Sequence, residues 1–335
     1  MITTIGQLLL MLILILVAAE IFTNALEHLG DRLGISEGVT GSLFAAVGTA
    51  MPESIIPLIA LFAGTQSQQI NEEIGVGAIL GAPLMLSTLS LSLMGAAALQ
   101  QRGIQGHLHP ERTGLARDLN FFLVAFGLAA LVLFIPHQHD AVRIGLSVLL
   151  VVIYFIYVLM TLRVSARLVE DGHVTQAHSE LFFCRFGMSD NMQTILLQLA
   201  GALALLVIGA DGFVDGVEEG SKAFGISALL LSLLVVPVAT ELPEKINSIL
   251  WIRRHKDTLA FGNITGAMVF QGTLLPAMGI MLTPWTPQPE VYFGIAVTYT
   301  AAVWLRFRLE FGFLRVWHLG INGLLYLTYL TLVLR

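Results

Sequence analysis

The sequence predicts an all-α membrane protein with ten transmembrane helices, arranged as two five-helix repeats of opposite orientation. Three observations predict this fold class: an apolar composition, ten apolar segments of spanning length and an internal repeat. Of the 335 residues, 56% are hydrophobic and 12% are charged, and the mean hydropathy is +0.81. A water-soluble chain of this length could not cover itself with polar surface, so we expect an integral membrane protein.

The apolar segments each approach the roughly 20 residues that a helix needs to cross a bilayer. They lie at residues 3–26, 40–64, 75–99, 119–136, 141–163, 192–214, 227–252, 261–283, 289–307 and 313–334. The first segment is not expected to be a signal peptide, because no basic residue precedes it and Glu20 and Asn24 follow without a small-residue cleavage site. The loops are short except at 164–190, which we interpret as a linker.

An internal repeat relates the two halves, because residues 20–53 recur at a constant offset as residues 211–244. The matched pairs are Glu20/Asp211, Phe22/Phe213, Asn24/Asp215, Glu27/Glu218, Gly34/Gly225, Ile35/Ile226, Ser36/Ser227, Thr49/Thr240, Pro52/Pro243 and Glu53/Glu244. Each copy ends in Thr-x-x-Pro-Glu within an apolar segment, where a proline breaks backbone hydrogen bonds and a carboxylate needs a partner. This repetition predicts a cation site at the interface of the repeats.

The basic residues predict the orientation. With the N-terminus outside, thirteen fall on the inside, namely Arg32, Arg102, Arg112, Arg117, Arg163, Arg167, Arg185, Arg253, Arg254, Lys256, Arg306, Arg308 and Arg315. Three fall outside, namely Arg143, Lys222 and Arg335. The positive-inside rule therefore favours both termini outside. An odd number of helices per repeat inverts the second copy, so the domains are a first repeat at 1–163, a cytoplasmic linker at 164–190 and a second repeat at 191–335.

Several other function classes find no support in the sequence. The net charge of −6 comes without a basic stripe, so no nucleic-acid partner is expected. A single cysteine, Cys184, excludes an internal disulfide. The pairs His107/His109 and His137/His139 are too small for a closed metal site and receive no role. Because signatures such as Gly-x-Ser-x-Gly and His-Glu-x-x-His are absent from the sequence, we expect no enzyme and no cofactor.

Two segments resemble the two alpha-repeats of the sodium/calcium exchanger superfamily, the cation/Ca2+ antiporters. GSLFAAVGTAMPES at 41–54 and LLVVPVATELPEK at 233–245 are similar to the family signature Gly-Thr-Ser-x-Pro-Glu. IGADGFVDGVEEGSKAFGIS at 208–227 resembles the sixth helix of the family, and GNITGAMVFQ at 262–271 resembles the eighth. The resemblance covers nearly the whole chain. It implies the sodium/calcium exchanger fold and alternating access, with helices one and six moving across a rigid core.

The same resemblance implies an ion site formed by both repeats. Its ligands would be Thr49, Glu53, Thr240 and Glu244. Threonine and glutamate are spaced i, i+4 in each copy, so both can lie on one helical face. The proline before each glutamate frees carbonyls of the preceding turn, which suit Na+ or Ca2+. The alternative interpretation is that each motif marks a kinked helix whose carboxylate lies in a hydrogen-bonded network.

The sequence departs from the family where Ca2+ selectivity is expected. The signature hydroxyl positions hold Ala50, Glu241, Ala82 and Ala267. The Asn or Asp ligand of helix three falls on Leu86, and that of helix eight falls on Gln271. Glu241 and Gln271 therefore join the candidate metal ligands. Ca2+ takes about six to eight oxygens, more than these residues supply by themselves.

A lysine in the seventh span is a further departure. Glu241 precedes Lys245 by four residues, the favourable order for an ion pair on a helix, although Pro243 lies between them. Two interpretations stay open. Lys245 is either a built-in cation that exchanges with a transported ion or proton, or a residue that permanently neutralises Glu241 or snorkels.

Polar residues on helices one and six also allow two interpretations, as the lining of access paths or as an interface cluster near the outer helix ends. They are Glu20, Asn24, Glu27 and His28 on the first helix, and Asp211, Asp215, Glu218 and Glu219 on the sixth. The acidic pair Glu72/Glu73 is expected to be a solvated loop end.

Together, these observations predict a multi-pass antiporter of the inner membrane that exchanges Ca2+ or another cation for Na+ or H+. Its partners would be inorganic cations and the lipid bilayer, with no obligate protein partner. One alternative is a monovalent Na+/H+ or K+/H+ antiporter that has lost Ca2+ selectivity. An alternative of another class is a membrane sensor or scaffold that transports nothing.

Overall fold

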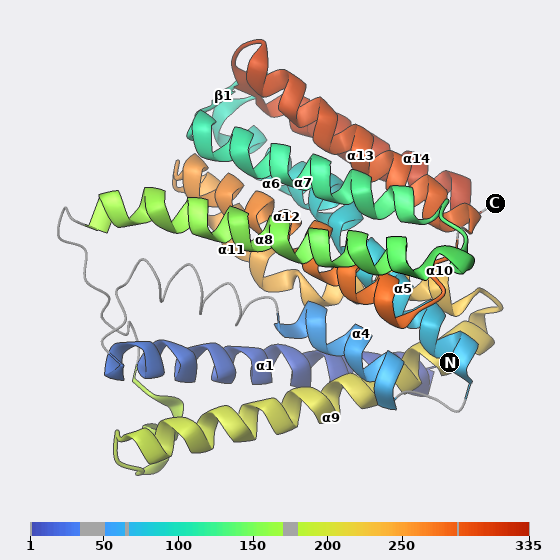
Figure 1. The fold of residues 1–335 in the computed structure, drawn as a ribbon. Coiled ribbons are helices and arrows are strands. Elements are labelled where there is room, and N and C mark those ends of the chain that lie inside the picture. Colours follow the sequence, from blue (N-terminus) through green and yellow to red (C-terminus); the bar gives the residue numbers. More distant parts are fainter. Residues whose placement is uncertain (1, 34–50, 64–66, 170–179, 287, 335) are drawn as a thin grey trace. The chain divides into compact units, whose positions relative to one another are not determined.

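The computed structural model describes residues 2–33, 51–63, 67–169, 180–286 and 288–334 (Figure 1). The α-helices are α1 (Ile2–Arg32), α4 (Met51–Ala63), α5 (Gln68–Met85), α6 (Leu91–Arg102), α7 (Arg112–Val132), α8 (Asp140–Val169), α9 (Met192–Phe224), α10 (Ala228–Thr240), α11 (Leu242–Arg253), α12 (Asp257–Leu282), α13 (Pro289–Glu310) and α14 (Val316–Val333). A π-helix, η2 (Leu86–Ser90), joins α5 to α6, and the 3-10 helices are η3 (His137–His139) and η4 (Phe182–Phe186). Two short strands, β1 (His107–Leu108) and β2 (Leu314–Arg315), pair antiparallel.

The helices of the described residues confirm a mostly helical protein with several membrane-spanning segments. Seven stretches are long and apolar enough to cross a membrane: Thr4–Leu26, Gln68–Arg102, Arg112–Val132, Asp140–Arg163, Met192–Phe224, Asp257–Leu282 and Val316–Val333. The shorter apolar helices Pro52–Ala63 and Ala228–Val238 fall within two further predicted segments, and α13 covers another. The count of ten spans in two inverted repeats stays a prediction.

The chain forms two compact units. Unit 1 contains Met1–Ser67 and Phe155–Gly225, and unit 2 contains Gln68–Tyr154 and Ile226–Arg335. Helix α8 passes from one unit to the other between Tyr154 and Phe155. Each unit therefore takes helices from both predicted repeats, and the boundaries of those repeats stay a prediction.

Unit 1 is built on α1, which lies along α9 (Figure 1). Buried Asn24 on α1 accepts hydrogen bonds at Oδ1 from Gln198 Nε2 on α9, at 2.9 Å, and from the Phe182 backbone N–H, at 3.1 Å. Gln198 also donates to the Ile21 carbonyl at 3.0 Å. Buried polar groups need such partners. Asn24 thus joins α1, α9 and η4.

Unit 2 holds α5 close against α10. A Cβ atom added to Gly81 would lie 2.4 Å from the Leu233 carbonyl oxygen, so only glycine permits this approach of the two backbones. The Ser232 hydroxyl reinforces the contact by donating to the Ile74 carbonyl at 2.7 Å. The interior position of α10 therefore follows from small residues on α5.

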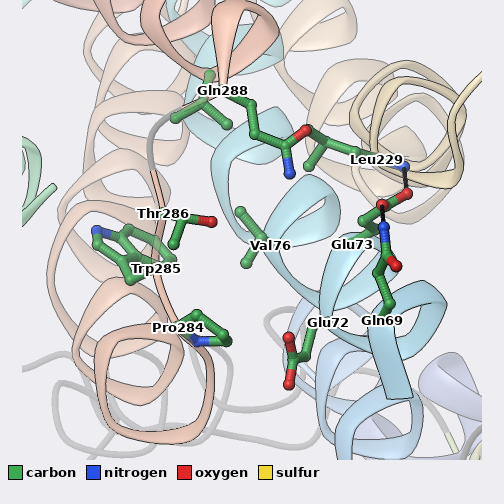
Figure 2. Close-up of a pocket in the computed structure, with 10 residues that line it drawn as sticks. Gln69, Glu72, Glu73, Val76, Leu229, Pro284, Trp285, Thr286 and Gln288 are labelled. Carbon is green, nitrogen blue, oxygen red and sulfur yellow. Dashed lines mark hydrogen bonds between the residues drawn. The ribbon is translucent and has the colours of Figure 1, made fainter. Parts of the chain in front are cut away.

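The N-terminus of α10 is held by Glu73 from α5 (Figure 2). The Glu73 carboxylate accepts hydrogen bonds from Gln69 Nε2 at 3.0 Å and from the Leu229 backbone N–H at 3.4 Å. A carboxylate at a helix N-terminus interacts favourably with the helix dipole. Glu73 is therefore more than the solvated loop residue that the sequence suggests. Beside it, Glu72 and Trp285 help to line a cavity of about 170 Å³.

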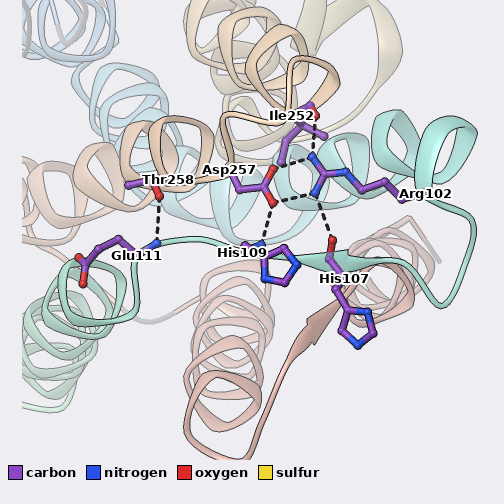
Figure 3. Close-up of polar contacts among 7 residues, drawn as sticks. All are labelled: Arg102, His107, His109, Glu111, Ile252, Asp257 and Thr258. Carbon is purple, nitrogen blue, oxygen red and sulfur yellow. Dashed lines mark hydrogen bonds and ion pairs between the residues drawn. The ribbon is translucent and has the colours of Figure 1, made fainter.

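The start of α12 is anchored to the end of α6 by a buried ion pair (Figure 3). Arg102 donates from Nη2 and Nη1 to the two oxygens of Asp257, at 2.6 and 2.7 Å, and its side chain is 8% exposed. Asp257 also accepts the His109 backbone N–H at 2.7 Å. Arg102 reaches the Ile252 carbonyl at 2.9 Å as well. This pairing fixes the helix that carries Gln271.

Helix three contains a feature that its sequence pattern did not predict, the π-helix at Leu86–Ser90. Asn322 from α14 donates from Nδ2 to the Ser87 carbonyl at 2.7 Å, and Asn322 is fully buried. Leu86, at the position where the family places a ligand, is fully buried in the same stretch. π-helical turns inside α-helices are rare and occur often at functional sites.

In the second copy of the repeat, local caps define the end of α9 and the start of α10. Gly225 ends α9 with φ 66°, a left-handed conformation that favours glycine. The Ser227 hydroxyl then accepts the Leu230 backbone N–H at 3.1 Å and caps α10. The matched residues Gly34 and Ser36 lie outside the described residues.

Candidate cation-binding site

The seventh predicted span is interrupted at Glu241. Helix α10 ends at Thr240 and α11 begins at Leu242, while Glu241 adopts φ −89° and ψ 10°. Backbone bonds continue on both sides, from Glu241 N to the Pro237 carbonyl at 3.3 Å and from Lys245 N to the Glu241 carbonyl at 3.0 Å. Pro243 has no N–H and cannot donate to the preceding turn. The sequence predicted a kink here, and the structure locates the break two residues before the proline.

The break places several polar side chains in the interior of unit 2. Their exposed fractions are 1% for Thr240, 0% for Glu241, 4% for Glu244, 5% for Lys245 and 2% for Gln271. Four come from the α10–α11 segment, and Gln271 comes from α12. Charges at such depth require partners.

Lys245 pairs with Glu241. Its Nζ lies 3.1 Å from Glu241 Oε2 and donates to the Pro237 carbonyl oxygen at 2.9 Å. Gln271 Nε2 makes a long hydrogen bond of 3.5 Å to the other carboxylate oxygen, Glu241 Oε1. The predicted ion pair is thus confirmed, and both oxygens of Glu241 face donors of the protein.

Two buried oxygens in this cluster remain available to a ligand. Among the described residues, neither Thr240 Oγ1 nor Gln271 Oε1 has a hydrogen-bond partner. The amide nitrogen of Gln271 must face the Glu241 carboxylate, since an oxygen there would be repelled, so its oxygen is left for another group. Hydroxyl and amide oxygens are suitable ligands for Na+ or Ca2+.

The Glu244 backbone is fixed by a residue that the sequence did not single out as a ligand. Asn263 on α12 donates from Nδ2 to the Glu244 carbonyl at 3.1 Å and to the Ser248 hydroxyl at 3.0 Å. Ser248 in turn donates to the Ala260 carbonyl at 3.3 Å. The signal in the sequence was the Gly262–Asn263 pair of the resemblance. Its role here is to position the helix that carries Glu244.

The first-repeat candidates belong to unit 1. Glu53 lies in the first turn of α4 and is 4% exposed, while Thr49 lies outside the described residues. The assignment of Thr49, Glu53, Thr240, Glu241, Glu244 and Gln271 to one metal site therefore stays a prediction. Within it, the structure brings together Glu241 and Gln271, with Lys245 as a third member.

The polar residues of helices one and six are interpreted either as the lining of access paths or as an interface cluster, and the structure places individual residues differently. Asn24 forms the helix interface described above. On α9, Asp211, Asp215 and Glu219 are exposed, and Glu218 pairs with Lys222 at 2.5 Å. The access-path interpretation of these exposed carboxylates stays a prediction.

Comparisons with known proteins place the chain among exchangers. The sequence pattern of a family described as sodium/calcium exchanger protein matches residues 3–163 and 194–335. The inner membrane protein YrbG of Escherichia coli K12 is 25% identical over 281 residues, which cover 84% of this chain and 80% of YrbG. The crystal structure of the H+/Ca2+ exchanger CAX superposes with a TM-score of 0.73 at 16% identity, over 98% of this chain and 82% of that one. The sodium-calcium exchanger NCX_Mj gives 0.58 at 20% identity, over 98% of both chains.

Proposed function

Because the chain belongs to the sodium/calcium exchanger protein family, with a match over most of its length, we propose that it is a secondary active cation antiporter. The observation that carries the proposal is the interior cluster at the helix break. Thr240 and Glu244 lie in the α10–α11 segment, and Gln271 lies on α12; the side-chain oxygens of Thr240 and Gln271 are buried and have no hydrogen-bond partner among the described residues. Buried ionisable and polar groups at an interrupted helix are a feature of ion-binding sites in membrane transporters.

The transported ion is Ca2+ or another cation, exchanged for Na+ or H+. The structural neighbours are named an H+/Ca2+ exchanger and a sodium-calcium exchanger, which supports this ion class. Glu53 and Glu244 supply the charge from the two repeats. The inner membrane, with both termini outside, is the proposed location, in keeping with the name of YrbG and with the distribution of basic residues.

A monovalent Na+/H+ or K+/H+ antiporter is the second candidate. It is favoured by Leu86, which provides no oxygen at a family ligand position, and by Lys245, which cancels the charge of Glu241. Fewer oxygens and less negative charge favour monovalent cations over Ca2+.

Alternating access is the proposed mechanism. The resemblance implies that helices one and six move together, and α1 and α9 pack against each other within unit 1. Helices α10, α11 and α12, which carry the second-repeat candidates, belong to unit 2. Unit 1 also contains α4, which the resemblance assigns to the rigid core, so the support from this division concerns the pairing of α1 with α9.

The test is cation flux into vesicles that contain the purified protein, measured with labelled Ca2+, Na+ and a K+ substitute against imposed ion and proton gradients. Glu53→Gln and Glu244→Gln should each reduce exchange to the level of empty vesicles while the protein stays folded. The matched control is Glu310→Gln, because this carboxylate is 60% exposed and should be dispensable.

Each outcome separates the candidate functions. Exchange of Ca2+ supports the first candidate, and exchange of monovalent ions alone supports the second. Full transport by either glutamine variant would remove that glutamate from the site, and a folded wild-type protein that moves none of the cations would point to a sensor or scaffold.

A further inference from the structure

The surroundings of the Lys245 ammonium resemble those of a bound metal ion. Nζ lies 2.9 Å from the Pro237 carbonyl oxygen and 3.1 Å from Glu241 Oε2, and the side chain is 5% exposed. A backbone carbonyl and a carboxylate are the hard oxygens that proteins offer to Na+ and Ca2+. In this cluster the Pro237 carbonyl oxygen and Glu241 Oε2 contact the Lys245 ammonium, which is covalently attached to the chain.

The positive charge of Lys245 balances the negative charge of Glu241 within the cluster. Glu241 and Lys245 sum to zero, and Gln271 Nε2 occupies the other Glu241 oxygen at 3.5 Å. The buried oxygens of Thr240 and Gln271 lie in the same cluster and have no hydrogen-bond partner among the described residues.

The geometry can be compared with that of a purely structural ion pair. A buried pair is stabilising only where further hydrogen bonds satisfy both partners. Around Glu241 and Lys245, however, Thr240 Oγ1 and Gln271 Oε1 have no hydrogen-bond partner among the described residues. Two hard oxygens that suit a cation therefore lie in the same cluster as the ion pair.

We infer that the Lys245 ammonium is a tethered cation that permanently fills one monovalent cation position of the second repeat. The inference rests on the proposed antiport function and deepens it. Lys245 acts as a specificity-determining residue, because its fixed charge lowers by one the number of monovalent cations that the protein can bind.

The test compares wild type and Lys245 variants by the number of Na+ ions that each protein binds. The full chain is purified in detergent, and bound Na+ is measured by equilibrium binding of labelled Na+ at neutral and at mildly alkaline pH. Lys245→Met is the main variant, since methionine is shorter than lysine by its terminal atom and leaves the position of Nζ open. The matched control is the double variant Lys245→Met/Glu241→Gln, which removes both charges.

Lys245→Met should bind one Na+ more per protein than wild type, because Glu241 and the Pro237 carbonyl become free to hold it. The double variant should return to the wild-type number. Should Lys245→Met fail to fold, Lys245→Leu serves instead, since leucine also removes the ammonium, offers no donor to Glu241 and leaves the ammonium position open.

Equal Na+ binding by wild type and the single variants at both pH values would overturn the inference and leave a structural ion pair. An extra Na+ that persists in the double variant would also overturn it, because Glu241 would not be its ligand. A failure of the proposed function would be seen in the flux assay, as a wild-type protein that moves no cation. The difference in bound Na+ between wild type and variants is a separate measurement, and it tests the role of Lys245.

Discussion

Removing the negative charge of Asp257 should destabilise the protein strongly. The Asp257 and Arg102 side chains are 4% and 8% exposed, and the pair is bidentate, with N–O distances of 2.6 and 2.7 Å. In Asp257→Asn, the amide group would turn a donor toward the guanidinium donors, and Arg102 would lose its counter-charge in a nearly dry position.

The expected magnitude follows from these contacts. At least one charged hydrogen bond is lost, worth about 1.5–3 kcal/mol, and removing one partner of a buried pair typically destabilises a protein by about 3–5 kcal/mol. We therefore expect the free energy of unfolding to fall by about 3–5 kcal/mol. Removing both charges in Arg102→Leu/Asp257→Leu should be less damaging, since no charge is left buried and unpaired.

The assay is equilibrium unfolding of the purified protein in mixed micelles with increasing denaturing detergent, with thermal inactivation half-lives as a second measure if unfolding is irreversible. The matched control is Asp190→Asn. Its partner Arg32 lies at 3.2 Å, but the two side chains are 47% and 51% exposed, and exposed pairs contribute about 0–1 kcal/mol. An Asp257→Asn protein no less stable than the control would refute the reasoning.

Two further predictions concern orientation and acid stability. In a background with Cys184→Ser, a cysteine at Gln69 should react with an impermeant thiol reagent from outside and one at Gln105 should not, and the reverse pattern would overturn the orientation. Burial raises the pKa of the Glu111 carboxyl, but the two backbone N–H groups that it caps at the start of α7 lower it by more, so the net pKa lies below its ordinary value. The stability difference between wild type and Glu111→Gln should therefore be present at neutral pH and be lost as the pH falls through the lowered pKa of this carboxyl. Unfolding curves of wild type and Glu111→Gln at neutral pH and at acidic pH measure this stability difference. A difference that persists at acidic pH would show that the cap does not depend on charge.

The class of the protein and its family could be predicted from the sequence by itself. Apolar segment length and the spacing of Thr-x-x-Pro-Glu are local properties, and a hydrocarbon environment leaves few ways to satisfy them. The resemblance of the motifs was confirmed by the family match over residues 3–163 and 194–335. The pairing of Glu241 with Lys245 followed from their i, i+4 spacing.

The tertiary structure decided the features that depend on which helices pack together. Asp257 finds Arg102 across 155 positions of the chain, and Asn263 supports the Glu244 carbonyl from another helix. The break at Glu241 and the contact of Lys245 with the Pro237 carbonyl likewise could not be predicted, because a proline indicates a kink without locating the residue that leaves the helix. Local pattern thus predicted which residues enter the membrane interior, and packing between distant segments determined which of them meet there.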